Sequence, residues 1–395
     1  MDPLSILIIG ACLLVAWNIG ANDASNAIGT TVGGGILPFH KAVIIVVVFA
    51  LLGATLEGYK VMKTVGKGIV PAVECETDEP CRAINAEYTC AITSPPNAKV
   101  TTGECRSHVN GQKIIYLEKD RRAVLAAFLA AGVFMLAITA LKIPTSTTQA
   151  LIGAVAGAGI GLNLFGGMPA PINYAILKTM LVSWVLSPLC SMVLAYVLYH
   201  FFNRILARSG SRATTSALVK VLTLVAAMAV AYNLGANDVA NAMGPLVGSN
   251  VLNEYALKGG WSSVESGHVY IDLHVLPTMV GALLGGVCLG LGAIMFGRGV
   301  VETMGGGITT LGPVSALGAQ FASAITVYVF IQQGIPVSTT QAIVGGVIGV
   351  GLTKGTRTVN LRTIRNIMLG WLATPISGAV LSIAFYYILR QVLPA

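Results

Sequence analysis

The chain has 395 residues, of which 55% are hydrophobic and 10% are charged, and its formal net charge is +8. Soluble proteins carry about 25% charged residues and disordered chains are charge-rich, so this composition excludes both classes. Lipid must surround most of the chain, and the sequence predicts an all-α polytopic membrane protein. The basic residues are not interleaved with aromatic residues, so binding of nucleic acid is not expected.

Apolar segments long enough to cross a bilayer follow one another along the chain. A spanning helix needs about 20 mostly apolar residues, and we expect about 10–12 transmembrane segments. Ten are recognisable as apolar runs, at 4–22, 41–58, 122–141, 144–163, 173–203, 216–235, 275–297, 312–334, 336–353 and 366–390. The first is interpreted as a mature span, because no basic residues precede it as they would in a signal peptide.

Basic residues in short loops predict the orientation, since Lys and Arg accumulate on the cytoplasmic side of membrane proteins. Two clusters stand out, Arg204, Arg208, Arg212 and Lys220 in the first and Lys354, Arg357, Arg362 and Arg365 in the second. Both clusters are therefore expected in the cytoplasm. Counting crossings outward from them places both termini and the loops 59–121 and 250–274 on the extracellular side of the plasma membrane.

The loop 59–121 contains four cysteines within 31 residues, namely Cys75, Cys81, Cys90 and Cys105. An even number of closely spaced cysteines on an outer face is typical of disulfides, and four cysteines allow three pairings. The alternative is a zinc site, but its usual pattern of two close cysteine pairs does not match these spacings. We expect disulfides and leave their pairing open.

Two polar blocks occur twice in the chain. The block N-I-G-A-N-D-A-S-N-A-I-G at 18–29 recurs as N-L-G-A-N-D-V-A-N-A-M-G at 233–244. The block I-P-T-S-T-T-Q-A at 143–150 recurs as I-P-V-S-T-T-Q-A at 335–342. A weaker echo is a Trp four residues before a Pro, at Trp184 with Pro188 and at Trp371 with Pro375. The same order in both halves indicates a duplication.

The duplication divides the chain into a first membrane repeat at 1–203, a short cytoplasmic linker at 204–215 and a second repeat at 216–395. Each repeat contains five predicted segments, and an odd number of crossings inverts the second copy relative to the first. In each repeat, the two apolar segments nearest the S-T-T-Q copy leave an alternative open. Segments 122–141 and 144–163 form either two crossings or a re-entrant hairpin, and so do 312–334 and 336–353.

The G-A-N-D-x-x-N blocks place carboxylates inside apolar spans, where ionisable residues are costly and usually functional. Asp23 and Asn26 are three residues apart and share a helix face, as Asp238 and Asn241 do. With the neighbouring amides of Asn22 and Asn237, these oxygens suit a hard cation. A hydrogen-bonded helix-packing motif is the alternative, but two copies that each hold a carboxylate favour an ion site.

The S-T-T-Q blocks follow a proline, which is favourable at the first turn of a helix. The hydroxyls then lie at a helix N-terminus, where free N–H groups and the helix dipole attract anions. The alternative is an ordinary Ser or Thr cap, which the repetition of the whole block disfavours. We assign to the anion site Asn26, Ser146, Thr147, Thr148, Asn241, Ser338, Thr339 and Thr340, and to the cation site Asn22, Asp23, Gln149, Asn237, Asp238 and Gln341.

The paired G-A-N-D-x-x-N-A and P-x-S-T-T-Q-A blocks closely resemble those of the PiT family of inorganic phosphate transporters. The resemblance covers both halves of the chain. It implies phosphate import by symport with sodium, and alternating access around a site that both repeats form. It implies no cofactor other than the transported ions, and it is compatible with a homodimer in the lipid bilayer, although the sequence leaves the oligomeric state open. Some relatives use protons or carry sulfate, and proton-coupled phosphate or sulfate symport remains the alternative.

Two other classes of function are compatible with single features of the sequence. Two membrane aspartates suggest an intramembrane aspartyl protease, but here both lie in the same duplicated block, which favours a symmetric binding site over an enzyme. A passive anion channel is disfavoured because unneutralised Asp23 and Asp238 would repel the permeating ion.

Overall fold

Long apolar helices make up most of the computed structural model. It describes residues 2–33, 36–70, 74–75, 88–92, 103–107, 120–141, 145–166, 172–208, 212–248, 251, 275–304, 312–355 and 360–393. The elements of the first half are α1 Pro3–Gly33, α2 Phe39–Leu56, α3 Gly58–Lys63, the π-helical turn η1 Thr64–Gly68, α5 Arg121–Ala140, α6 Thr147–Phe165 and α7 Tyr174–Ala207. Those of the second half are α8 Arg212–Asn233, the π-helical turn η2 Leu234–Val239, α9 Ala240–Gly248, α11 Val275–Met304, α12 Pro313–Gln332, α13 Thr339–Leu352 and α14 Leu361–Val392.

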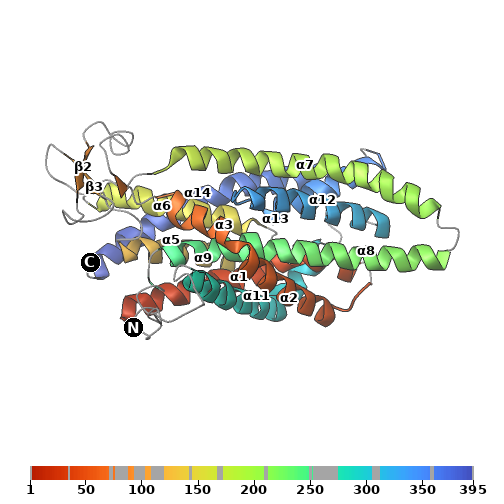
Figure 1. Ribbon diagram of the computed structural model, residues 1–395, viewed down its shortest axis with the longest axis horizontal. Helices are drawn as coiled ribbons and strands as arrows, with labels where there is room; N and C mark the ends of the chain where they lie inside the picture. The colour runs from red at the N-terminus through yellow and green to blue at the C-terminus, as the bar shows by residue number, and fades with distance from the viewer. Residues whose placement is uncertain are drawn as a thin grey trace, which may run out of the picture.

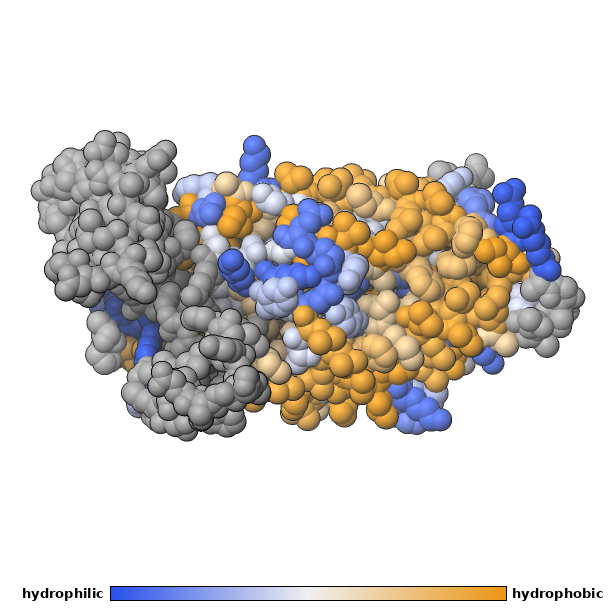
Figure 2. Space-filling model, in the orientation of Figure 1, coloured by the Kyte–Doolittle hydropathy of each residue, from blue (hydrophilic) through white to orange (hydrophobic). Residues whose placement is uncertain are grey.

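Among the described residues, nine helices are long and apolar enough to cross a membrane, and α13 is a shorter apolar helix. The large hydrophobic residues that they expose are mostly Leu, Val and Ile, as expected for helices that face lipid. Figure 2 shows this apolar surface running from the middle of the molecule toward the α7–α8 connection, with a hydrophilic patch over α3. The predicted polytopic helical membrane fold is confirmed.

The α5–α6 and α12–α13 pairs each fold back as a hairpin within one half of the molecule, an arrangement that favours the re-entrant alternative. Both termini lie at one end of the molecule and the α7–α8 connection lies at the other (Figure 1). The α5–α6 hairpin lies in the half with the termini, and the α12–α13 hairpin lies in the half with the α7–α8 connection. The two hairpins therefore enter from opposite ends, as an inverted repeat requires.

Each hairpin packs against the last helix of the other repeat. Helix α6 lies on α14, where a Cβ at Gly153 would come within 2.1 Å of the carbonyl oxygen of Pro375. Helix α13 lies on α7 in the same way, since a Cβ at Gly345 would come within 2.2 Å of the carbonyl oxygen of Pro188. Only glycine permits these helix backbones to approach so closely. The two repeated prolines, Pro188 and Pro375, therefore lie where a helix of one repeat packs closely against a helix of the other.

The end of the molecule that carries the termini is fastened by Asp120, which precedes α5. Its carboxylate accepts hydrogen bonds from the Tyr386 hydroxyl on α14, at 2.8 Å, and from Nε of Arg122, at 3.0 Å. Arg121 in turn pairs with Asp2 at 3.0 Å. The orientation prediction expects basic residues at the opposite end of the molecule. Arg121 and Arg122 are exceptions to it, and both have acidic partners.

A small three-stranded antiparallel sheet, absent from the sequence prediction, lies in the loop between η1 and α5. Its strands are β1 Glu74–Cys75, β2 Tyr88–Ile92 and β3 Gly103–Ser107, in the order β1-β3-β2. The register of β2 and β3 pairs Cys90 with Cys105. Cys75 is in β1, whereas Cys81 lies outside the described residues.

We expect a disulfide between Cys90 and Cys105, because residues directly opposite in antiparallel strands have Cα atoms about 4.5–5.5 Å apart, within the range of disulfides. Cys75 lies opposite Gly103 and not opposite a cysteine. Peptide mapping of the unreduced protein by mass spectrometry tests this expectation. A linked peptide that joins Cys90 to Cys75 or Cys81 would contradict it.

Candidate functional site

The two G-A-N-D blocks lie inside helices that pass through the middle of the molecule. The first copy continues α1 as regular α-helix, and the second forms the wide π-helical turn η2 between α8 and α9. Such wide turns are frequently found at functional sites, since they displace backbone groups from the regular hydrogen-bond ladder. The side chains of Asp23 and Asp238 are each 1% exposed. Both carboxylates are therefore withdrawn from solvent within the protein.

The two S-T-T-Q blocks form the N-termini of α6 and α13 at the tips of the hairpins. Ser146 is the N-cap of α6, and its hydroxyl accepts a hydrogen bond from the backbone N–H of Gln149 at 3.2 Å. Ser338 caps α13 through Gln341 with the same distance. The capping alternative thus describes the serines, whereas the threonines that follow them make a different set of contacts.

Asp23 is held by one hydroxyl from each hairpin. Its Oδ2 accepts from Thr147 Oγ1 at 2.5 Å, within the same repeat. Its Oδ1 accepts from Thr340 Oγ1 at 3.2 Å, from the other repeat. Because a hydroxyl that donates to a charged acceptor forms a strong hydrogen bond, both hairpin tips are tied to this one carboxylate.

Asp238 repeats the arrangement with the roles of the hairpins exchanged. Its Oδ2 accepts from Thr339 Oγ1 at 3.0 Å, and its Oδ1 accepts from Thr148 Oγ1 at 2.8 Å. Thr339 and Thr148 occupy the places in the repeats that Thr147 and Thr340 occupy around Asp23. The structure therefore brings the four threonines and both aspartates into one centre with approximate two-fold symmetry.

The asparagines of the repeated block continue this exchange. Asn26 donates through Nδ2 to Thr340 Oγ1 at 2.9 Å, and Asn241 donates to Thr148 Oγ1, also at 2.9 Å. Asn22 reaches Thr139 on α5, at 3.3 Å. Asn237 holds the second hairpin tip, since its Nδ2 donates to the Val337 carbonyl and its Oδ1 accepts from the Val337 N–H.

Several buried oxygens in this centre have no hydrogen-bond partner among the described residues. They are the side-chain amide oxygens Oε1 of Gln149, Oε1 of Gln341 and Oδ1 of Asn241. A buried polar atom without a partner is costly unless water or an ion satisfies it. Amide and carboxylate oxygens are ligands of hard cations, so these oxygens could hold such an ion.

The first residue of each repeated block has a structural role that the sequence did not reveal. Asn18 donates through Nδ2 to the Gly132 carbonyl on α5 at 3.2 Å, and Asn233 donates to the Ala324 carbonyl on α12 at 2.7 Å. These bonds join each G-A-N-D helix to the first arm of the hairpin of its own repeat. The recurrence of an asparagine at both places was the available signal.

Comparisons with known proteins identify the family of this centre. A profile of the phosphate transporter family matches residues 19–382. Two similar proteins are candidate phosphate permeases of Haemophilus influenzae, 27% identical over 96% of this chain and 94% of the relative, and of Pyrococcus abyssi, 26% identical over 98% of each. A third, from Methanocaldococcus jannaschii, is 32% identical over 65% of this chain and 72% of its own length.

The fold also matches a solved structure that is described as the sodium-dependent phosphate transporter. The TM-score is 0.73 at 23% identity, and the match covers 99% of this chain and 100% of the other. The helical membrane fold is therefore shared with that transporter. Because the family profile matches most of the chain, the chain belongs to the phosphate transporter family.

Proposed function

We propose that this chain imports inorganic phosphate by symport with sodium. The observation that carries the proposal is the pair of buried carboxylates, each bridged by one hydroxyl from each hairpin tip. This centre combines ligands for a cation with two helix N-termini that can receive an anion. The described structural relative, a sodium-dependent phosphate transporter, agrees with this choice of ions.

Sodium is proposed to bind at the two carboxylates. A buried carboxylate is costly in a membrane protein, and a cation that it ligates offsets much of this cost. The unpartnered amide oxygens of Gln149 and Gln341 lie at equivalent places in the two repeats and would complete the coordination. Asn22 and Asn237 belong to the proposed set as well, although the oxygen of Asn237 would be shared with the backbone of Val337.

Phosphate is proposed to bind between the N-termini of α6 and α13. At a helix N-terminus the first backbone N–H groups have no partner within the helix and carry partial positive charge. The hydroxyls of Thr147, Thr148, Thr339 and Thr340, with the caps Ser146 and Ser338 and the amides of Asn26 and Asn241, form the proposed cradle. Coupling follows because the two carboxylates repel phosphate until sodium neutralises them.

Alternating access is proposed to arise from the two hairpins. They enter from opposite ends of the molecule and meet at the same carboxylates, so moving one hairpin would open the centre to one side only (Figure 1). We place the boundary between the repeats in the linker 204–215. The basic clusters near this linker and before α14 favour a cytoplasmic location of that end, with both termini outside.

Uptake of radiolabelled phosphate into proteoliposomes tests the coupling ion. We expect accumulation that requires an inward sodium gradient and that stops when choline replaces sodium at constant pH. Uptake that persists in choline but follows a proton gradient would replace sodium with protons. An excess of sulfate is expected to leave uptake unchanged, and strong competition would instead favour the sulfate-carrying alternative.

A further inference from the structure

The first arms of the two hairpins differ in polarity although they occupy equivalent places. Helix α12 buries Ser315, Gln320, Ser323 and Thr326, none of which is more than 5% exposed. When the repeats are aligned on their S-T-T-Q blocks, the equivalent residues of α5 are Ala123, Phe128, Ala131 and Phe134. One arm therefore carries a buried polar stripe where the other carries methyl groups and aromatic rings.

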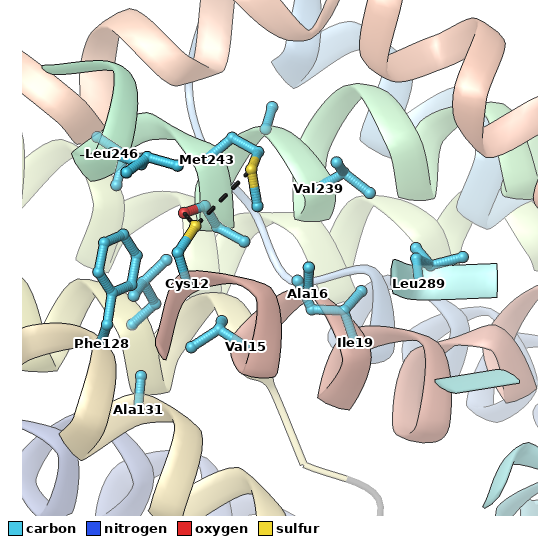
Figure 3. Packing of buried hydrophobic residues seen from close by; sticks show 14 of the residues in the cluster. Cys12, Val15, Ala16, Ile19, Phe128, Ala131, Val239, Met243, Leu246 and Leu289 are labelled. Atoms are coloured by element: carbon cyan, nitrogen blue, oxygen red, sulfur yellow. Dashed lines mark hydrogen bonds between the residues drawn. The ribbon is translucent and has the colours of Figure 1, made fainter. Parts of the chain in front are cut away.

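The apolar stripe of α5 closes a dry layer on the side of the termini. Figure 3 shows Phe128 and Ala131 beside Cys12 and Val15 of α1, with Met243 and Leu246 of α9 nearby. All of these residues are at most 1% exposed and belong to one hydrophobic cluster. The Cys12 thiol donates within this layer to the Ala242 carbonyl at 3.5 Å. Ions cannot cross such a layer without losing their hydration.

The equivalent layer on the side of the α7–α8 connection is partly polar, although it keeps the buried apolar residues Ile28, Ala227 and Val230. Gln320 replaces Phe128, and Thr31 of α1 occupies the place that Leu246 has in the other repeat. Gln320 Nε2 donates to the Ala27 carbonyl at 2.8 Å, next to Asn26 of the carboxylate centre. Gln320 Oε1 and Thr31 Oγ1 are buried and have no hydrogen-bond partner among the described residues. Buried oxygens of this kind need water or an ion.

We propose that Gln320, Ser323 and Thr31 line the route by which phosphate and sodium pass between the carboxylate centre and the end with the α7–α8 connection. This inference rests on the proposed function. In the structure the route is closed, because all three side chains are at most 1% exposed. The route opens when α12 moves away from α1, and its polar groups then replace part of the hydration of the ions.

Thiol labelling of Ser323→Cys and Ala131→Cys tests the route, with the two variants as matched partners at equivalent places. Detergent-purified protein is treated with a charged methanethiosulfonate reagent, and peptide mass spectrometry separates the new cysteine from the native ones. We expect Ser323→Cys to react at least about tenfold faster than Ala131→Cys, because brief openings admit water only along the polar layer. Equal rates, or faster reaction of Ala131→Cys, would overturn the proposal.

A second variant connects the route to transport. Gln320→Phe copies the residue that closes the other side, and it is expected to slow both phosphate uptake and labelling of Ser323→Cys by about tenfold or more. Unchanged labelling in this background would contradict the route. Labelling measures access of water and not transport, so a chain that fails the uptake assay can still show the difference between Ser323→Cys and Ala131→Cys.

Discussion

Asp23→Asn and Asp238→Asn are each expected to reduce sodium-driven phosphate uptake by about 100-fold or more. Removing one member of a buried charge pair costs about 3–5 kcal/mol, and here the partner is the proposed sodium ion. The amide keeps the shape of the side chain. Its oxygen can still accept a hydrogen bond from one threonine hydroxyl, and its NH2 group can donate to the oxygen of the other. The variants should therefore remain folded, as size-exclusion chromatography and thermal unfolding of the purified proteins would show.

The control for these variants is Asp120→Asn, which alters a buried carboxylate outside the centre. Its contacts with Tyr386 and Arg122 are structural, so we expect a lower unfolding temperature but ordinary uptake per folded molecule. Normal sodium-driven uptake by either Asp23→Asn or Asp238→Asn would show that these carboxylates, like Asp120, only support the fold.

Thr148→Val and Thr340→Val are each expected to weaken apparent phosphate and sodium affinity by about 5- to 150-fold. Each valine keeps the side-chain shape but removes the hydroxyl that donates to an aspartate of the other repeat. A buried group that loses its partner costs about 1–3 kcal/mol. The two effects should be similar in size, because the bonds are equivalent under the approximate two-fold symmetry. Concentration dependence of uptake measures both affinities.

Thr145→Val is the matched control for the hydroxyl variants. Thr145 is buried beside the same hairpin tip, but the equivalent residue of the second repeat is Val337. The substitution therefore makes the first repeat more like the second, and uptake should hardly change. If it fell as far as in Thr148→Val, loss of any hydroxyl near the tip would explain the effect, and the bond to Asp238 would have no special role.

The periodic and repeated features of this fold were predictable from sequence. Long apolar runs are expected to span the bilayer as helices, because a helix pairs its own backbone polar groups where no water is present. The doubled G-A-N-D and S-T-T-Q blocks indicated the inverted repeat and selected the residues that the structure gathers around Asp23 and Asp238. Features that depend only on residue type and order along the chain could therefore be predicted from the sequence.

Features that depend on contacts between the repeats were not predictable. The sequence did not show that Thr340 serves Asp23 while Thr148 serves Asp238, because such pairing depends on how the hairpins cross. The strands of the sheet in the loop are too short to show a clear alternation of polar and apolar residues in the sequence. Aligning the two repeats sets Gln320 against Phe128, so this polar residue could have been found in the sequence. Its contact with Ala27 of α1, next to the carboxylate centre, could not.

The exchange of hydroxyls between repeats bears on how such a chain could arise. One repeat alone supplies a carboxylate with a single threonine donor, and the second donor comes from the other repeat. Its hairpin helix likewise finds its close-packing partner on the other repeat. An unduplicated ancestor could complete this centre only as two identical chains inserted in opposite directions. Gene fusion would then have fixed both topologies in one polypeptide, after which α5 and α12 were free to diverge.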